Sequence, residues 1–74
     1  MHLKNDALIK FGEKVKIARK ISGFSQEDLA SRAGLHRTYI GMIERGEKNI
    51  TLLNILKISS ALNTTLDKLL GDLN

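Results

Sequence analysis

The sequence lacks cysteine altogether, and its 74 residues include only two histidines, His2 and His36. Without cysteine the chain can form neither a disulfide bond nor a zinc site built on thiolates. Neither histidine has nearby carboxylates at the spacing of metal ligands. We therefore expect no metal ion and no other cofactor.

Long apolar runs are also missing. The N-terminal stretch MHLKNDALIKF is interrupted by charges at Lys4, Asp6 and Lys10, and it has no signal-peptide core. No other run approaches the length that spans a membrane. Together with the lack of cysteine, these absences predict a cytoplasmic protein with no membrane partner.

The sequence carries no arrangement typical of catalysis. A catalytic nucleophile requires an activating base, and that base requires a group that orients it. The two histidines are separated by a predicted helix, and no glycine-rich phosphate loop occurs. We predict that the protein is not an enzyme and that it has no small-molecule ligand.

The charge of the chain is distributed unevenly. Residues 1–48 hold ten Lys and Arg against six Asp and Glu, whereas residues 49–74 hold two of each, so the net charge of +4 lies entirely in the first part. The last third is neutral and rich in Leu and Ile. This asymmetry suggests an anionic partner for the first part and an apolar partner for the second.

Apolar residues recur at helical spacing throughout, which predicts a compact all-α bundle of five helices. A stripe from Leu8 to Ala18 indicates the first helix, which Gly23 ends. Ser25 begins the second, and Asp28 completes an imperfect capping box because Glu or Gln is usual there. The other predicted helices span about 37–45, 52–62 and 66–72.

The second and third predicted helices, joined by a turn at Gly34, form a helix-turn-helix. The stretch SQEDLASRAGLHRTYIGMIERGEKN resembles the Cro/repressor (Xre-type) DNA-binding family, and the likeness extends over nearly the whole chain. Within that family, LHRTYIGMIERGEKNIT and the total length are most similar to the controller proteins of restriction-modification systems. The resemblance implies one repressor-like domain over residues 1–74.

The resemblance also implies a function. A controller protein is a homodimeric transcriptional regulator that binds double-stranded DNA at a near-palindromic operator. It activates at one site and represses at another, either recruiting or excluding RNA polymerase, and it remains with the bacterial nucleoid. Two alternatives stay open, namely a phage-like repressor or antitoxin autoregulator and a protein-interaction module that has lost DNA binding.

In this family the third helix enters the major groove with its N-terminal residues toward the base edges. If Ile40 and Ile43 point inward, positions 37, 38, 41, 42 and 45 lie near the opposite side. Arg37 can contact guanine O6 and N7 together. The predicted base-reading residues are Arg37, Thr38, Tyr39 and Met42.

Each of these residues also has a purely structural interpretation. Arg37 could be a solvated charge, Met42 could fill the surface or a dimer edge, and the ring of Tyr39 could pack half into the core. Gly41 is costly inside a helix. It provides either clearance for DNA or the Arg37 side chain, or close helix packing.

Phosphate contacts are expected on either side of the recognition helix. The start of the second helix offers free backbone N–H groups to an anion, and the family has a second phosphate clamp in the loop that corresponds to GEKNIT. Glu47 departs from that clamp and must point away from a phosphate. The predicted phosphate-contacting residues are Ser25, Gln26, His36, Lys48, Asn49 and Thr51.

Arg19 and Glu44 match a family pair that joins the first helix to the third. The resemblance therefore implies a structural ion pair that braces the recognition helix. Loss of either partner would leave a partly buried charge unpaired.

The fourth predicted helix has more large aliphatic residues than one core-facing stripe needs. A small domain with this surplus favours a homodimer through the last third of the chain, about residues 50–74. The alternative is that all of these residues fill the core. The predicted interface residues are Leu53, Leu56, Leu66 and Leu69.

Overall fold

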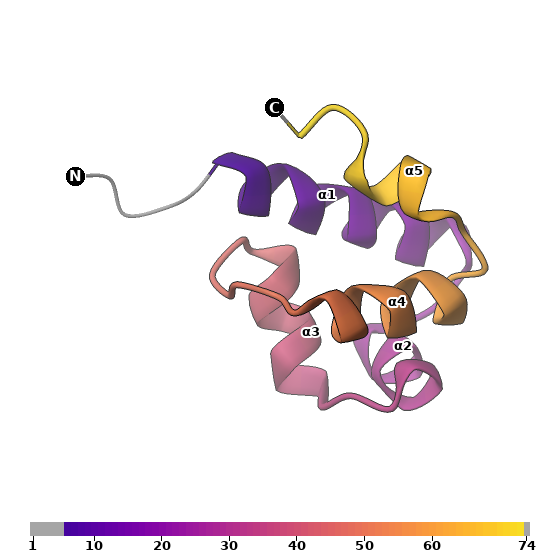
Figure 1. The fold of residues 1–74 in the computed structure, drawn as a ribbon. Coiled ribbons are helices and arrows are strands. Elements are labelled where there is room, and N and C mark those ends of the chain that lie inside the picture. Colours follow the sequence, from indigo (N-terminus) through magenta and orange to yellow (C-terminus); the bar gives the residue numbers. More distant parts are fainter. Residues whose placement is uncertain (1–5, 74) are drawn as a thin grey trace.

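The described part of the chain, residues 6–73, forms five α-helices and no β-strand in the computed structural model (Figure 1). The predicted all-α fold with a helix-turn-helix is confirmed. The fifth helix is shorter than predicted because Gly71 is extended, with ψ 148°, and Asp72 has a φ of 60°. The helices are α1 Asp6–Ile21, α2 Gln26–Ala33, α3 Arg37–Glu44, α4 Leu52–Ala61 and α5 Leu66–Leu70.

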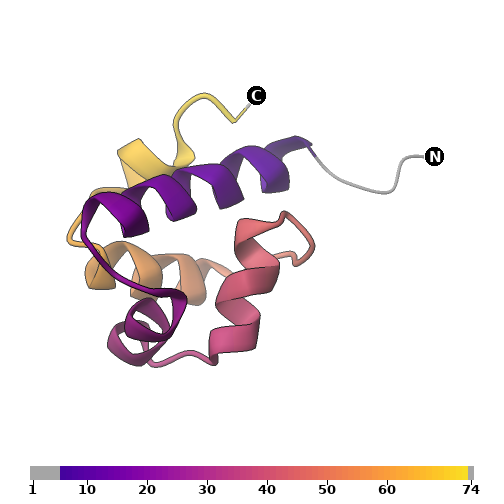
Figure 2. The same cartoon turned by 180° about the vertical axis from the view of Figure 1, so that it is seen from behind.

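The five helices pack into one small bundle with different elements at its two ends. In both views α1 and α5 lie side by side at one end, while the turn between α2 and α3 lies at the other (Figures 1 and 2). Helix α4 runs between them and contacts both α2 and α5. The N-terminal end of α3 therefore lies far from α5.

All five helices contribute side chains to the core. Phe11 and Val15 of α1 are four residues apart and therefore lie on one face, where both are buried. Ile40 and Ile43 of α3 are buried as predicted. Removing each such side chain from water stabilises the fold by about 1.5–3 kcal/mol. The remaining buried apolar residues are Leu29, Ala30, Ala33, Ile58, Leu62 and Leu69.

Helix α1 crosses α3 at very close range. A Cβ atom added to Gly12 would collide with the backbone oxygens of Ile43 and Glu44. Glycine is therefore required at this crossing, since a larger residue would push the two helices apart. The close approach fixes the position of the last turn of α3 against α1.

The predicted capping box at the start of α2 is present. Ser25 Oγ accepts a hydrogen bond from the Asp28 backbone N–H at 3.0 Å, and Asp28 Oδ2 accepts one from the Ser25 N–H at 2.9 Å. Aspartate thus performs the role that Glu or Gln usually has. The hydrogen bond from the Ser25 backbone is the main cause that lowers the pKa of Asp28 below its ordinary value of 3.8.

Candidate nucleic-acid interface

The turn between α2 and α3 depends on one left-handed residue. Gly34 has a φ of 68°, and its N–H donates to the carbonyls at the end of α2. Residues with a Cβ rarely adopt this conformation. His36 then caps α3, because its Nδ1 accepts a hydrogen bond from the Thr38 N–H at 3.4 Å. A helix start without an acidic residue is thus capped by an imidazole.

The ring of His36 has a second nitrogen for the predicted phosphate contact. A neutral imidazole whose Nδ1 accepts a hydrogen bond carries its proton on Nε2. The residue is exposed at the helix start, so this N–H is a suitable donor to an anion. The phosphate contact itself stays a prediction.

Residues of α2, of α3 and of its C-cap surround a shallow hollow of about 220 Å³. Three predicted DNA-contacting residues line it, and so do two residues outside the predicted set. Two of the five carry guanidinium groups, which can bind phosphate or guanine edges. The lining residues are Gln26, Arg37, Thr38, Gly41 and Arg45.

Arg45 is the charged residue of this hollow that lies outside the predicted site set. Its position follows Gly41 by four residues, so helical spacing alone places both on one side of α3. A Cβ on Gly41 would lie 3.2 Å from Arg45 Nη1 and 3.7 Å from Gln26 Oε1. The missing side chain of Gly41 therefore makes room for the Arg45 guanidinium, rather than for that of Arg37.

Arg45 is also oriented by a carboxylate. Its Nε donates to Glu47 Oε2 at 3.0 Å, and both side chains are largely exposed. The Glu47 carboxylate is thus engaged with Arg45. Such an exposed pair contributes little stability, but it limits the directions that the guanidinium can take.

The ion pair implied between Arg19 and Glu44 is present. Arg19 Nε lies 2.6 Å from Glu44 Oε2, and Arg19 Nη2 donates to Glu44 Oε1 at 3.1 Å. Both residues are buried. A third nitrogen, Nη1, donates to the Phe24 carbonyl at 2.9 Å. The hydrogen bonds with Glu44 are the main cause that raises the pKa of Arg19.

Gln26 belongs to this buried network as well as to the exposed hollow. Its Nε2 donates to Glu44 Oε1 at 3.0 Å, and the residue is half-buried. The side-chain amide is therefore partly committed to the brace. A phosphate at the start of α2 would meet the free backbone N–H groups there and the remaining amide hydrogen of Gln26.

Tyr39 connects α3 to α4. Its ring packs against the core, and its hydroxyl accepts a hydrogen bond from Asn54 Nδ2 at 3.0 Å. The structure thus agrees with the interpretation in which the ring is half-buried. Because the Tyr39 oxygen only accepts in this hydrogen bond, its own O–H can still donate to DNA, and this contact stays a prediction. Met42 is partly buried, and its contact with DNA also stays a prediction.

The loop after α3 is held against α1. Gly46 has a φ of 73°, and a Cβ there would lie 2.9 Å from Ile9 Cα. The predicted phosphate-contacting residues Lys48 and Asn49 are exposed on this loop. Thr51 is exposed too, but its Oγ1 caps α4 by accepting from the Asn54 N–H at 3.2 Å.

The geometry of this surface agrees with the comparison to known families. Residues 15–69, more than half of the chain, match the family described as Helix-turn-helix. The chain belongs to the helix-turn-helix family.

Several relatives of this helix-turn-helix protein carry the name control protein. Control protein C.SmaI of Serratia marcescens is 52% identical over 58 residues, covering 78% of this chain and 69% of the relative. Control protein C.MunI of a Mycoplasma species is 44% identical over 70 residues, covering 93% and 95%. The sequence-based resemblance to controller proteins is therefore confirmed.

Solved structures similar to this chain include a restriction-modification controller protein and a DNA-bound regulator. The controller protein C.AhdI from Aeromonas hydrophila matches with a TM-score of 0.82 and 45% identity, covering 84% of this chain and 94% of that one. The biofilm regulator SinR, in complex with DNA, matches with a TM-score of 0.78 and 33% identity over 81% and 97% of the two chains.

The fourth helix of this helix-turn-helix protein exposes several leucines, as its aliphatic surplus predicts. Leu53 and Leu56 are 68% and 43% exposed, and Leu52 is 63% exposed. Leu66 is half-buried. The prediction is wrong for Leu69, which is only 1% exposed because α5 turns this side chain into the core between α1 and α4.

Within residues 6–73, His, Cys, Asp and Glu form no group that could hold a metal ion. Over the same residues, no helix combines the length and apolar character needed to cross a membrane. His2 lies outside the described residues.

Proposed function

We propose that the protein is a sequence-specific DNA-binding regulator of restriction-modification genes, formed by a single domain over residues 1–74. Its similarity to controller proteins supports this proposal. The observation that carries it is the hollow along α3, where Arg37 at the start of the helix and Arg45 at its end lie beside Gln26 and Thr38. A module without DNA binding has no use for this arrangement.

Recognition in this proposal divides between bases and phosphates. Arg37 and Thr38 are exposed at the leading end of α3 and read base edges, while Tyr39 and Met42 make secondary contacts. Backbone phosphates are held on both sides of the helix by the start of α2 and by the loop after α3. The phosphate-contacting residues are Ser25, Gln26, His36, Lys48, Asn49 and Thr51, to which we add Arg45.

The protein acts as a homodimer through α4. Leu53 and Leu56 line a hollow of about 370 Å³ together with Ala33 of α2. Exposed leucines beside a concavity suit a self-complementary contact, in which a side chain of each copy enters the hollow of the other. A two-fold dimer presents two recognition helices to half-sites about 34–36 Å apart on a near-palindromic operator.

Regulation then follows from occupancy near a promoter. A bound dimer either recruits or excludes RNA polymerase, and the position of the operator decides which of the two occurs. A controller of this kind activates at one site and represses at a second as dimers accumulate. Because its target is DNA, the protein works at the nucleoid in the bacterial cytoplasm.

Selection of DNA from a random pool tests the proposal. The full chain is incubated with random duplexes, and bound DNA is amplified and sequenced over several rounds. We expect a near-palindromic sequence whose half-sites are one helical turn apart. Recovery of random sequences after every round would refute the proposed function.

A further inference from the structure

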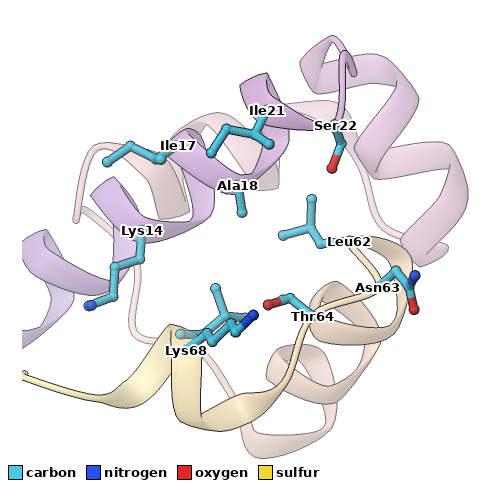
Figure 3. A pocket seen from close by; sticks show the side chains of 10 residues that line it. Lys14, Ile17, Ala18, Ile21, Ser22, Leu62, Asn63, Thr64 and Lys68 are labelled. Carbon is cyan, nitrogen blue, oxygen red and sulfur yellow. The ribbon is translucent and has the colours of Figure 1, made fainter.

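A groove of about 460 Å³ lies between the C-terminal half of α1, the α4–α5 connection and α5 (Figure 3). We call it the α1–α5 groove. Its floor is formed by Leu62 and Leu69, which belong to the core. Ile17 and Ile21 line it from α1 and remain 59% and 81% exposed. The groove is therefore apolar, and the protein's own side chains leave it open.

The side chains along α1 form a regular pattern. Lys14, Ile17 and Ile21 follow one another by three and four residues, so they share one face of the helix. The two isoleucines contribute little to the core because they are so exposed. Contiguous exposed apolar side chains, unlike scattered ones, mark interaction sites.

Cations border this apolar surface at one end. Lys14 of α1 and Lys68 of α5 both line the groove, and no Asp or Glu is among its lining residues. In Figure 3 the two lysines lie together at one end, while Ser22 and Asn63 lie at the other. The complementary surface is an aliphatic one with carboxylates at the matching end.

Other occupants fit this surface less well. Bound DNA would contact α2, α3 and the loop after α3, and none of the predicted DNA-contacting residues lines the groove. In the proposed dimer a second copy docks on Leu53 and Leu56 of α4, and neither residue lines the groove, so the groove stays open on each copy. A small ligand is usually 70–90% buried in its pocket, whereas both isoleucines here are mostly open to solvent.

We propose that the α1–α5 groove binds an amphipathic helix of a second protein. Such a helix presents aliphatic side chains at helical spacing to Ile17 and Ile21, and carboxylates to Lys14 and Lys68. The groove lies at the end of the molecule opposite the α2–α3 turn (Figure 1), so the partner can bind while the recognition helix is occupied. The proposal does not depend on the proposed DNA-binding function.

The test uses two synthetic helical peptides and the full chain labelled with ¹⁵N. Both peptides carry the same leucine face; one has glutamates at its flanks and the other has lysines. We expect the acidic peptide to shift amide signals in the second half of α1 and in α5. We also expect the lysine peptide to bind at least about tenfold more weakly, because it places like charges together.

Two sets of variants sharpen the test. Ile17→Ser/Ile21→Ser should abolish binding of the acidic peptide, whereas Leu52→Ser, at a comparably exposed leucine of α4 outside the predicted dimer-interface set, should retain it. Lys14→Glu/Lys68→Glu should reverse the preference toward the lysine peptide. Circular dichroism establishes that each variant is folded, which we expect because the substituted side chains are outside the core.

Three results would overturn the proposal. The first is equal binding of both peptides, or no binding of either. The second is acidic-peptide binding that persists in Ile17→Ser/Ile21→Ser or produces shifts on α4 instead. The third is a change of the protein from dimer to monomer in Ile17→Ser/Ile21→Ser, since the groove would then be the contact between copies.

Discussion

Arg19 of α1 and Glu44 of α3 form a buried ion pair with two hydrogen bonds, of 2.6 and 3.1 Å. The pair ties the last turn of the recognition helix to the first helix. Gln26 adds a hydrogen bond from the start of α2. One carboxylate therefore holds three helices in the arrangement that the proposed DNA surface requires.

Glu44→Ala should destabilise the fold by about 3–5 kcal/mol, because Arg19 would remain buried without its partner. Urea denaturation followed by circular dichroism measures this loss. Gln26→Ala is the matched control, since it removes only one neutral donor from Glu44 and should cost about 1 kcal/mol. Equal losses for the two variants would contradict the importance of the ion pair.

Arg37→Ala should lower discrimination at one operator position by about 1–3 kcal/mol, which is about 5- to 150-fold in affinity, while leaving the fold intact. Arg37 is exposed, so its removal leaves no cavity. Fluorescence anisotropy with the selected operator and single-base variants measures the change. Unchanged operator affinity would exclude Arg37 as a base reader.

Lys48→Ala is the matched control for Arg37→Ala. As a phosphate contact it should weaken binding to all sequences alike and reduce the slope of log affinity against log salt by about 1. A loss of affinity in Lys48→Ala that depends on the DNA sequence would show that Lys48 contacts bases rather than phosphates.

Gly41→Ala should separate folding from DNA binding. Alanine favours a helix over glycine by about 1 kcal/mol. The added Cβ would lie 3.2 Å from Arg45 Nη1, the end of a flexible side chain that can move away. We therefore expect unchanged or higher stability in thermal unfolding, together with weaker operator binding because Arg45 is displaced.

Arg45→Ala provides the comparison for Gly41→Ala. If the alanine at position 41 acts by displacing the Arg45 guanidinium, the double variant should lose less operator affinity than the sum of the two single losses. Fully additive losses in operator affinity would show that Gly41 gives clearance to the DNA itself.

Leu53→Lys should convert a dimer into a monomer, because the side chain is 68% exposed on the proposed α4 interface and a charge would be buried in the contact. Sedimentation velocity measures the oligomeric state. Ile17→Lys is the control, since it places the same charge on a comparably exposed isoleucine outside this interface. A Leu53→Lys variant that still sediments as a dimer would show that the interface lies elsewhere.

Local sequence signals were sufficient for the fold. Gly34 adopts the left-handed conformation that its place after α2 suggests, and Ser25 caps as expected. Leu69 could not be placed in the same way. Helix α5 has only five residues, too few for periodicity to distinguish an inward from an outward leucine, and packing on α1 and α4 decides the matter.

The candidate site could be predicted only in part, because some of its contacts join side chains that no local sequence pattern brings together. Helical spacing places Arg37 and Thr38 on the exposed face of α3. The hydrogen bond of Asn54 with Tyr39 depends instead on side-chain conformations, and so does the direction in which the Arg45 guanidinium extends over Gly41. Asn54 is separated from Tyr39 by the loop after α3, so no local pattern indicates their meeting.

The capping box makes the stability of α2 depend on pH. Because Asp28 accepts a hydrogen bond from the Ser25 backbone, its pKa in the folded chain is below the ordinary value of 3.8. A depressed carboxyl pKa adds stability that is complete above the unfolded value and is lost as the pH falls through the folded value. Asp28→Asn should therefore lower stability at neutral pH and make the loss of stability below pH 3.8 shallower.

Thermal unfolding across a pH series, from neutral to below the pKa of free aspartate, measures this effect. Glu27→Gln is the matched control, because it removes a carboxylate from the same turn without touching the hydrogen bonds between Ser25 and Asp28. The acid limb of its stability curve should remain close to that of the parent chain. If Glu27→Gln flattens this limb as much as Asp28→Asn does, the effect comes from the general charge at the start of α2 rather than from the capping box.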